Sequence, residues 1–317
     1  MKTKLSLIIF IIGIMNLFTI RDMTAQSWTM AKHCGGKGPD QGYGMVMDTS
    51  GNIYFTGTIK DDAYFDSIHL WCGYPGVCFL AKYDHELNPI WVKIGRGGYF
   101  PFYNVGTGLC LDNDENVIWA GQYSGTSVFN QFTIQPLGGD YDLYIAKYDK
   151  NGNCMWITTV GGGGYEEINA VTYDGSDHFY ITGSINYPCA FDTITVNNTN
   201  GKFIPFVAKY STSGNCEWVY TPSCSQDSYG TGVVFKDNSL YFSGDFSGDL
   251  SIGQHQFSAD SNNAIFLAVL NTDGQPLSAT AAVGTGDFSS YDIAAAPNGD
   301  CYITGLFSGS VVINSDT

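Results

Sequence analysis

Apolar and polar residues alternate along the chain in short runs that turn residues separate. One clear run covers residues 169–173, and a second covers residues 178–184, with the sequence Asp174-Gly-Ser-Asp between them. A period of two residues is typical of a strand with one buried face, and Asp and Gly are common in tight turns. The pattern therefore predicts an antiparallel hairpin.

Two more strands are expected soon after this hairpin. Residues 203–210 are rich in apolar and β-branched residues, a Ser-Thr-Ser-Gly-Asn turn occupies residues 211–215, and residues 216–220 surround Trp218. Such residues favour strands. Four short antiparallel strands in a unit of about 60 residues are typical of one blade of a β-propeller.

The same pattern repeats along the whole chain. A tetrapeptide ending in glycine occurs at Gly57, Gly121, Gly183, Gly244 and Gly305, so that successive motif glycines are 64, 62, 61 and 61 residues apart. Leu80-Ala-Lys-Tyr83 recurs in phase with it, and so does a tryptophan series. The series predict repeat units at residues 28–90, 91–155, 156–217, 218–277 and 278–317.

These units predict an all-β fold, a β-propeller of four-stranded antiparallel blades with a repeat of about 62 residues. The propeller domain is expected to span residues 27–317, with its first strand, around Trp28, completing the last blade. The fifth unit stops before its third strand, so we expect an incomplete last blade and a fragment of a longer protein.

The N-terminus has the pattern of a secretory signal peptide. Lys2 and Lys4 precede an apolar run over residues 5–20, and small residues end at Ala25. A membrane anchor is the competing interpretation, but the run is shorter than the roughly 20 residues that span a bilayer. We expect residues 1–26 to be removed, which predicts a secreted or cell-surface protein without a membrane span.

The motifs resemble the bacterial SBBP-type β-propeller repeat family. The resemblance covers essentially all of the chain after the signal peptide, and its clearest copy is Ala146-Lys-Tyr-Asp-Lys-Asn-Gly-Asn-Cys-Met-Trp156 followed by four glycines at 161–164. The resemblance implies an exported or cell-surface protein, often from Bacteroidetes-type bacteria. It implies no assigned activity.

Charge narrows the choice of partner. The formal net charge is -16 for the whole chain, and removal of residues 1–26 takes away three bases and one acid, which leaves 11 − 29 = -18. Such a surface repels nucleic acid and anionic membranes. We therefore expect a protein or a glycan as the partner and no nucleic acid.

Catalytic motifs are missing from the sequence. No G-x-S-x-G or H-E-x-x-H motif occurs, which makes an enzyme uncertain and less favoured than a binding or interaction module. An extracellular enzyme acting on glycans, a hydrolase or a lyase, is the alternative, because paired carboxylates can come from distant blades. The five histidines fall at non-equivalent repeat positions: His33, His69, His85, His178 and His255.

One repeat position carries mostly acidic residues just before the first strand of each unit. First strands line the central channel of a propeller, so these side chains would face one another around its mouth, where a ring of them could hold a cation or another ligand. The favoured interpretation is that each side chain caps its own inter-blade turn, and the shared site is the alternative. The residues are Asp40, Asn104, Glu166 and Asp227, seventeen residues before the motif glycine, and Asp287 one place off.

Calcium is the one cofactor that the sequence suggests, and nothing makes it certain. The turn with Asp112, Asp114 and Glu115 is the most acidic of several Asp-rich turns. These turns lack the acidic twelfth ligand of an EF-hand loop, and hairpin turns in which Asp bonds to its own backbone are the favoured explanation. They are the candidate metal residues.

Trp71 and the cysteines complete the candidates. Trp71 is outside the repeat scheme; on an exposed loop it would stack on a sugar or a partner, and otherwise it would pack locally. All nine cysteines follow residue 26, and export permits disulfides. Cys72 and Cys78, six positions apart across an insertion, are the predicted pair.

Overall fold

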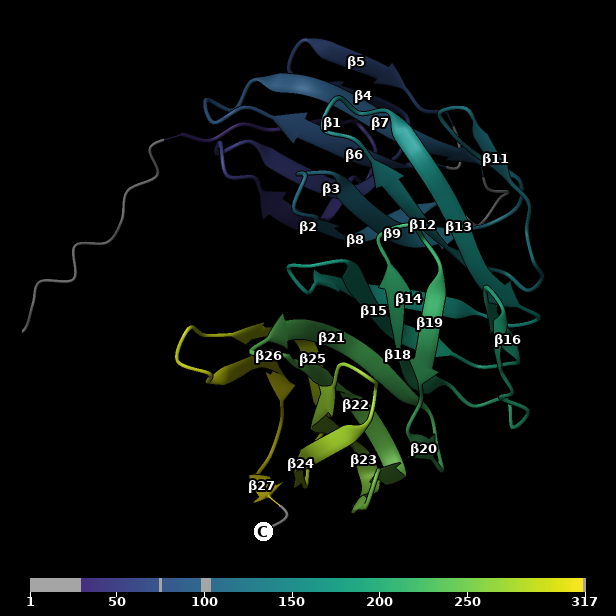
Figure 1. Ribbon diagram of the computed structural model, residues 1–317, viewed down its shortest axis with the longest axis vertical. Coiled ribbons are helices and arrows are strands. Elements are labelled where there is room, and N and C mark those ends of the chain that lie inside the picture. The colour runs from purple at the N-terminus through teal and green to yellow at the C-terminus, as the bar shows by residue number, and fades with distance from the viewer. Residues whose placement is uncertain (1–29, 74–75, 98–103, 316–317) are drawn as a thin grey trace, which may run out of the picture. The chain divides into compact units, whose positions relative to one another are not determined.

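The computed structural model describes residues 30–73, 76–97 and 104–315, and the chain divides into two units, Met1–Lys32 and His33–Thr317 (Figure 1). Of the first unit only residues 30–32 are described, so the predicted signal peptide and the strand around Trp28 lie outside the described residues. All named elements of the second unit are β-strands. The described residues include no helix of the length and apolarity needed to cross a membrane.

The first sheet is built from the strands of the first repeat unit in chain order. Its first four strands pair as antiparallel neighbours, and a short hairpin from the second unit extends the sheet beyond the fourth strand. The motif glycine lies on the second strand, the Ala-Lys-Tyr motif on the third and Trp91 on the fourth. The strands are β2 (Gln41–Met47), β3 (Ile53–Ile59), β6 (Val77–Tyr83), β7 (Pro89–Gly97), β10 (Ser127–Phe129) and β11 (Phe132–Ile134).

The second and third sheets repeat this order. The second sheet is also extended by a hairpin from the following unit, whereas the third consists of four strands. The second sheet contains β8 (Val105–Leu111), β9 (Val117–Tyr123), β12 (Asp142–Tyr148), β13 (Cys154–Gly162), β16 (Cys189–Phe191) and β17 (Ile194–Val196). The third contains β14 (Glu166–Tyr173), β15 (His178–Ile185), β18 (Ile204–Ser211) and β19 (Cys216–Tyr220).

The fourth sheet has two long strands, and two smaller sheets complete the unit. The strands of the fourth sheet are β20 (Ser223–Cys224), β21 (Ser228–Lys236), β22 (Ser239–Ile252), β23 (His255–Asn271), β24 (Pro276–Gly284) and β27 (Val311–Ser315). Their order in the sheet is β20, β22, β23, β24 and β27, and β21 pairs with β22 as well. The fifth sheet pairs β25 (Phe288–Ala295) with β26 (Cys301–Phe307). The N-terminal sheet joins β1 (Gly35–Gly36), β4 (Asp62–Phe65) and β5 (Ile68–Trp71).

The predicted antiparallel hairpins and their repeat are confirmed, but the strand number per sheet is not uniform. The short hairpin after the motif glycine pairs with the preceding sheet rather than with its neighbours in the chain, as Phe129 of β10 does with Gly95 of β7. A Cβ atom on Gly95 would collide with the Phe129 ring, so glycine permits this pairing. Within the described residues the sheets do not close into a ring.

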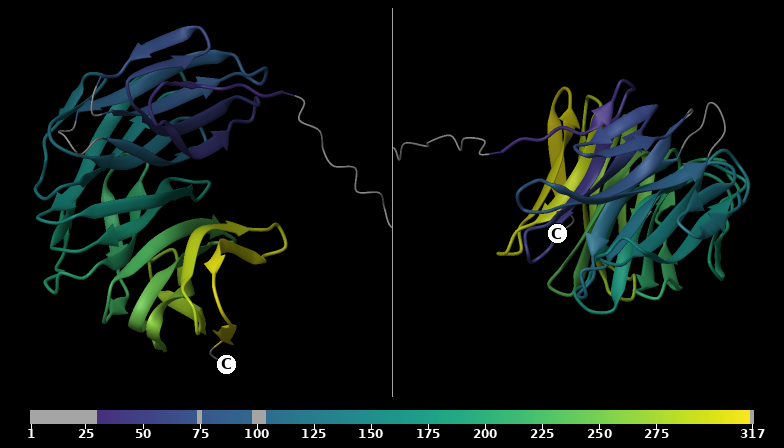
Figure 2. Two further views of the ribbon diagram at one scale, coloured as in Figure 1. Left: turned by 180° about the vertical axis from the view of Figure 1, so that it is seen from behind. Right: turned by 90° about the horizontal axis from the view of Figure 1, so that it is seen from above.

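Successive sheets pack through their first strands. Contacts join β2 to β8, β8 to β14, β14 to β21 and β21 to β25. Figure 2 shows the sheets following one another in chain order, from purple and blue to yellow. Leu109, Val233 and Ile293 occupy equivalent positions on these strands and are 9%, 5% and 7% exposed. The equivalent Met45 of the first sheet is 73% exposed. Burial at this position therefore comes from the preceding sheet.

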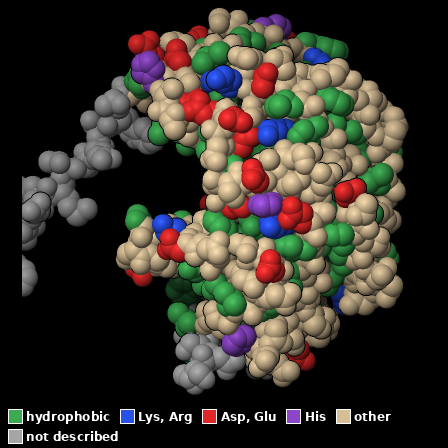
Figure 3. Space-filling model, in the orientation of Figure 1, with side chains coloured by type: hydrophobic (Ala, Val, Ile, Leu, Met, Phe, Trp, Pro, Cys, Tyr) green, Lys and Arg blue, Asp and Glu red, His purple; other side chains and the backbone are tan. Residues whose placement is uncertain are grey.

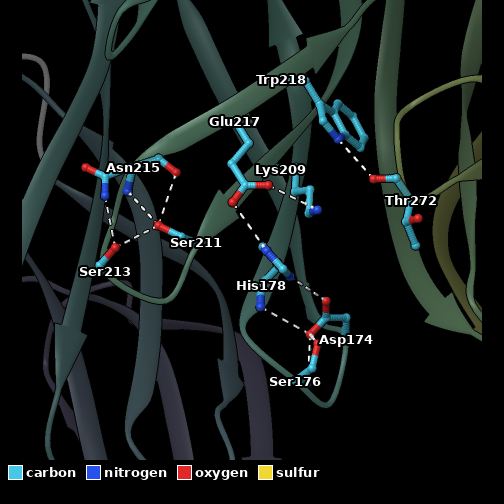
Figure 4. Close-up of polar contacts among 10 residues, drawn as sticks. All are labelled: Asp174, Ser176, His178, Lys209, Ser211, Ser213, Asn215, Glu217, Trp218 and Thr272. Carbon is cyan, nitrogen blue, oxygen red and sulfur yellow. Dashed lines mark hydrogen bonds and ion pairs between the residues drawn. The ribbon is translucent and has the colours of Figure 1, made fainter.

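The tryptophan series links each sheet to a turn of the next one. The indole Nε1 donates a hydrogen bond to a carbonyl 54 to 59 residues later, from Trp91 to Lys150 (3.2 Å), from Trp156 to Thr212 (3.3 Å) and from Trp218 to Thr272 (3.1 Å; Figure 4). Gly214 in the second of these turns has a positive φ of 92°, and its missing Cβ leaves room for the Trp156 ring. The tryptophan motif is therefore an inter-sheet clamp.

We expect Trp156→Ala to lower the free energy of unfolding by about 3–5 kcal/mol, the range for removing a large packed aromatic side chain. The variant loses the stacked contact with Phe179 and the hydrogen bond to Thr212. Trp71→Ala is the matched control and should cost less than about 0.5 kcal/mol, because Trp71 is 68% exposed. Denaturant midpoints measure both, and equal small losses would argue against the clamp.

Candidate functional site

A β-bulge occurs at the same repeat position in the first strand of each of the five sheets that carry the repeat. In each sheet the register between the first and second strands shifts by one residue, so that one residue of the first strand has no partner. Bulges bend a strand and re-aim a side chain, often beside functional sites. The extra residues are Tyr43, Thr107, Asn169, Thr231 and Tyr291.

These five bulge residues line one cavity. The cavity has a volume of about 450 Å³, and Val105, Gln122, Glu167 and Ser290 complete its lining. We call it the bulge cavity. Because each of the five sheets contributes its bulge residue, the repeat itself assembles the site.

Hydrogen bonds from neighbouring strands hold the polar side chains of the bulge cavity. The amide of Asn169 donates to the carbonyl of Gly230 at 2.8 Å, and that of Gln122 donates to the carbonyl of Glu166 at 3.0 Å. The hydroxyl oxygens of Thr231 and Ser290 are 2.7 Å apart. Side chains fixed in this way present a defined set of donors and acceptors.

The charge inside the bulge cavity is low. Glu167 is the one carboxylate among its lining residues, which include no lysine, arginine or histidine. Burial raises the pKa of Glu167. Two aromatic rings, Tyr43 (49% exposed) and Tyr291 (61% exposed), present apolar surface beside these polar groups. This combination suits a neutral polar ligand better than an anion.

The predicted ring of acidic residues is not formed around this cavity, whose lining includes none of them. Two of the five positions accept hydrogen bonds from backbone N–H groups of nearby loops instead. Asp40 accepts hydrogen bonds from the N–H groups of Gly36 (2.6 Å) and Lys60 (3.0 Å), and Asp227 accepts one from Phe203 (2.9 Å). These contacts are those expected of side chains that cap loops. The residue that faces the cavity is the bulge residue, three or four positions later in each strand.

The other three ring positions differ from these. Asn104 is buried and bonds to Gly95 and Ser127. Asp287 bonds through its backbone N–H to Ser308 Oγ at 3.1 Å. Glu166 is fully buried and lies against another carboxyl group.

Trp71 and Asp40 meet in a second depression. They line a groove of about 870 Å³ together with Asp61, Asp62 and Tyr64, among others. Trp71 lies at the end of strand β5 rather than on a loop, and Arg96 donates a hydrogen bond to its carbonyl at 2.8 Å. Trp71 is 68% exposed, and a role in binding a sugar or a partner stays a prediction.

The acidic turn predicted as a calcium site is already neutralised. Asp112 accepts hydrogen bonds from the N–H groups of Asp114 and Asn116, and its second oxygen lies 2.7 Å from Lys147 Nζ. Burial alone would raise the pKa of Asp112, but Lys147 and Asn116 hold it below its usual value. Glu115 bonds to Thr49. In the described ranges no three acidic, cysteine or histidine side chains form a metal-binding group.

The expected pairing of Cys72 with Cys78 does not occur, because both are free thiols in this structure, as are the other seven cysteines. Cys72 Sγ lies 3.9 Å from the carbonyl of Leu70, whereas Cys78, inside strand β6, lies 3.6 Å from that of Gly95. The two thiols therefore face different strands. Burial raises the pKa of Cys72 to about 11 and that of Cys78 to about 12, which makes both poor nucleophiles.

A polar network in the third sheet contains His178 (Figure 4). The ring nitrogens of His178 lie 3.0 Å from Asp174 and 3.3 Å from Glu217, which also pairs with Lys209 at 3.0 Å. Ser176 bonds to Asp174 rather than to the imidazole, so His178 has no nucleophile to activate there. In the first two sheets the equivalent position holds a simple ion pair, Asp48–Lys82 at 3.7 Å and Asp112–Lys147 at 2.7 Å.

Comparisons with known proteins give remote likenesses. No family model matches the chain. An uncharacterized WD repeat-containing protein from Acanthamoeba polyphaga mimivirus is 25% identical over 150 residues, which are 45% of this chain and 9% of that protein. The crystal structure of selenomethionine-substituted virginiamycin B lyase from Staphylococcus aureus has a TM-score of 0.37 and 10% identity, with coverage of 87% of this chain and 84% of the lyase chain.

The repeat and the likeness to a WD-repeat protein support a β-propeller repeat protein. The chain spans only 9% of the length of that relative. Neither similarity is strong enough to assign the activity of the similar protein to this chain. The structure shows an all-β chain of successive sheets, and the five repeat sheets share a bulge at one repeat position.

Proposed function

We propose that this protein is a binding module that takes a neutral, hydroxyl-rich ligand such as a short glycan into the bulge cavity. The observation that carries the proposal is the convergence of Tyr43, Thr107, Asn169, Thr231 and Tyr291, the bulge residues of five sheets, on one space. Equivalent positions of a repeat that meet in this way make a site which no single unit contains.

The lining chemistry supports this class of ligand. Hydroxyl and amide groups of Thr107, Thr231, Ser290 and Asn169 match the donors and acceptors of sugar hydroxyls. The Tyr43 and Tyr291 rings offer apolar faces to the C–H surface of a sugar ring. Without a cationic group among the lining residues, a phosphate or another anion would lack a counter-charge.

The cavity favours binding over hydrolysis. Glycoside hydrolysis generally needs two carboxyl groups on opposite sides of the scissile bond, and the lining of the bulge cavity includes one, Glu167. An extracellular glycan-acting enzyme therefore has no supporting observation in this cavity.

We place the protein outside the cell, secreted or on the cell surface, where it meets a glycan or a glycosylated protein. The support is in the sequence: the leader pattern of residues 1–26, the negative net charge and the resemblance to SBBP-type repeats. The negative charge is also spread over the visible face in Figure 3, where Asp and Glu side chains are scattered rather than gathered in one patch.

A glycan array probed with the purified protein tests the proposal. We expect retained glycans, and we expect Asn169→Ala to weaken their binding by about tenfold or more, equivalent to about 1.4 kcal/mol. Tyr302→Ala is the matched control, because Tyr302 is 58% exposed and is not a lining residue. An array without retained glycans, an unchanged Asn169→Ala variant, or cleavage of the glycan would each contradict the proposal.

A further inference from the structure

Two carboxyl side chains meet at the junction of the second and third sheets. Asp142 begins strand β12 and Glu166 begins strand β14. The residues before them, Tyr141 and Tyr165, form a parallel bridge, and the N–H of Glu166 donates to the carbonyl of Tyr141 at 3.2 Å. This pairing brings the two carboxyl groups side by side, within hydrogen-bonding reach of each other.

Both groups are almost completely removed from solvent. Asp142 is 1% exposed and Glu166 is 0% exposed. Asp142 Oδ2 accepts a hydrogen bond from the N–H of Leu137 at 2.7 Å. In contrast, Asp142 Oδ1 and both carboxyl oxygens of Glu166 are buried without a well-formed hydrogen bond, although the backbone N–H of Gly162 points toward both acids. Unpaired buried oxygens of this kind are costly.

The surroundings supply no positive charge to the pair. The ionisable groups that face it from the packed strands are Tyr123 on β9 and Cys189 on β16, and from β13 the backbone of Gly162 points at both acids. Among the ion pairs of the described residues, none joins a lysine, arginine or histidine to either acid. Two negative charges in this place would repel each other in a medium of low polarity.

We propose that Asp142 and Glu166 share one proton at neutral pH, and that this proton joins the second and third sheets and is lost in alkaline solution. Two carboxylates are both acceptors, so they can bond to each other only when one of them is protonated. The shared proton joins two of the three buried oxygens that lack a well-formed hydrogen bond.

The electrostatics of the site agree with this assignment. Burial, together with the charge of Asp142, raises the pKa of Glu166 to about 8. Burial raises that of Asp142 to about 6, although N–H groups oppose the change. A carboxyl group whose pKa is higher in the folded than in the unfolded state stabilises the fold below its unfolded pKa. That stabilisation falls as the pH rises through the folded pKa, here from about pH 4 to about pH 8.

Thermal unfolding as a function of pH tests the proposal. The melting temperature of the wild type should fall between about pH 5 and about pH 9, and unfolding near pH 7 should release about one proton from this pair. Glu166→Gln keeps a donor for Asp142 and removes the titration, so most of the fall should disappear. Glu86→Gln, at an exposed carboxyl group, is the control and should follow the wild type.

Three results would overturn the proposal. The first is a wild-type melting temperature that is independent of pH over this range. The second is a Glu166→Gln variant whose melting temperature falls as steeply as that of the wild type. The third is a rise in the wild-type melting temperature on adding calcium at alkaline pH that Glu166→Gln abolishes, because a cation would then occupy the place of the proton. If Glu166→Gln does not fold, calorimetric proton release by the wild type in buffers of different ionisation enthalpy decides the question.

Discussion

Replacing Trp119 with alanine is expected to lower the free energy of unfolding by about 3–5 kcal/mol. The Trp119 side chain is 0% exposed and packs edge-on against Tyr144, Tyr148 and Phe129, with ring centroids 5.2, 5.8 and 5.6 Å away. Its indole Nε1 also donates to Thr56 Oγ1 of the first sheet at 2.7 Å. The substitution therefore opens a cavity between two sheets and leaves a buried hydroxyl without its donor.

Denaturant unfolding measures this loss, with the m-value as the check that the two-state comparison holds. Trp119→Phe is the matched variant, since it keeps an aromatic ring and loses the bond to Thr56. Its cost should be clearly smaller than that of the alanine variant. A loss below about 1 kcal/mol for Trp119→Ala would mean that the first and second sheets do not depend on this contact.

Replacing Lys147 with methionine is expected to cost a similar amount, about 3–5 kcal/mol. Lys147 and Asp112 have side chains that are 10% and 5% exposed, with Nζ and Oδ2 2.7 Å apart. Methionine keeps most of the volume but removes the charge, so Asp112 remains as a buried anion. Loss of one partner of a buried pair generally costs more than loss of both.

Two further measurements identify the cause of this loss. The double variant Lys147→Met/Asp112→Asn should recover part of the stability, because it removes the unpaired charge. In the wild type the pKa of Asp112 is lowered, so its stabilisation is present above the unfolded pKa and is lost as the pH falls. The cost of Lys147→Met should accordingly shrink in acid. A double variant less stable than the single one would contradict this account.

The repeat made much of the fold predictable from the sequence. The motif glycine, the Ala-Lys-Tyr motif and the tryptophan series each mark one strand, and alternation marked the hairpins. The sheet to which the short hairpin around Phe129 belongs was not predicted, because its partner is the glycine-rich end of β7 in the preceding sheet. That pairing is a tertiary choice which local propensity does not encode.

The bulge cavity was missed for a different reason. Its five residues share a place in the repeat, fourteen residues before the motif glycine, or thirteen for Thr231, but they share no residue type. The acidic position three or four residues earlier had the stronger sequence signal and caps turns instead, as Asp40 does. A bulge changes which residue faces the cavity, and register is visible only in the paired strands.

The Asp142–Glu166 pair also lacked a sequence signal. Only Glu166 is at the acidic repeat position, and Asp142 comes from the strand of another sheet. Their contact depends on the parallel bridge between Tyr141 and Tyr165. The repeat pattern predicts what lies within one unit, whereas Asp142 and Glu166 come from different units and meet only in the folded protein.

Titration of a glycan retained on the array, measured by calorimetry, tests most directly whether the bulge cavity is the binding site. Two variants divide the possibilities: Asn169→Trp fills the bulge cavity, and Trp71→Ala removes the exposed ring from the second groove. We predict that Asn169→Trp raises the Kd about tenfold or more, while Trp71→Ala leaves it unchanged. A Kd that is unaffected by Asn169→Trp, or raised only by Trp71→Ala, would contradict the account.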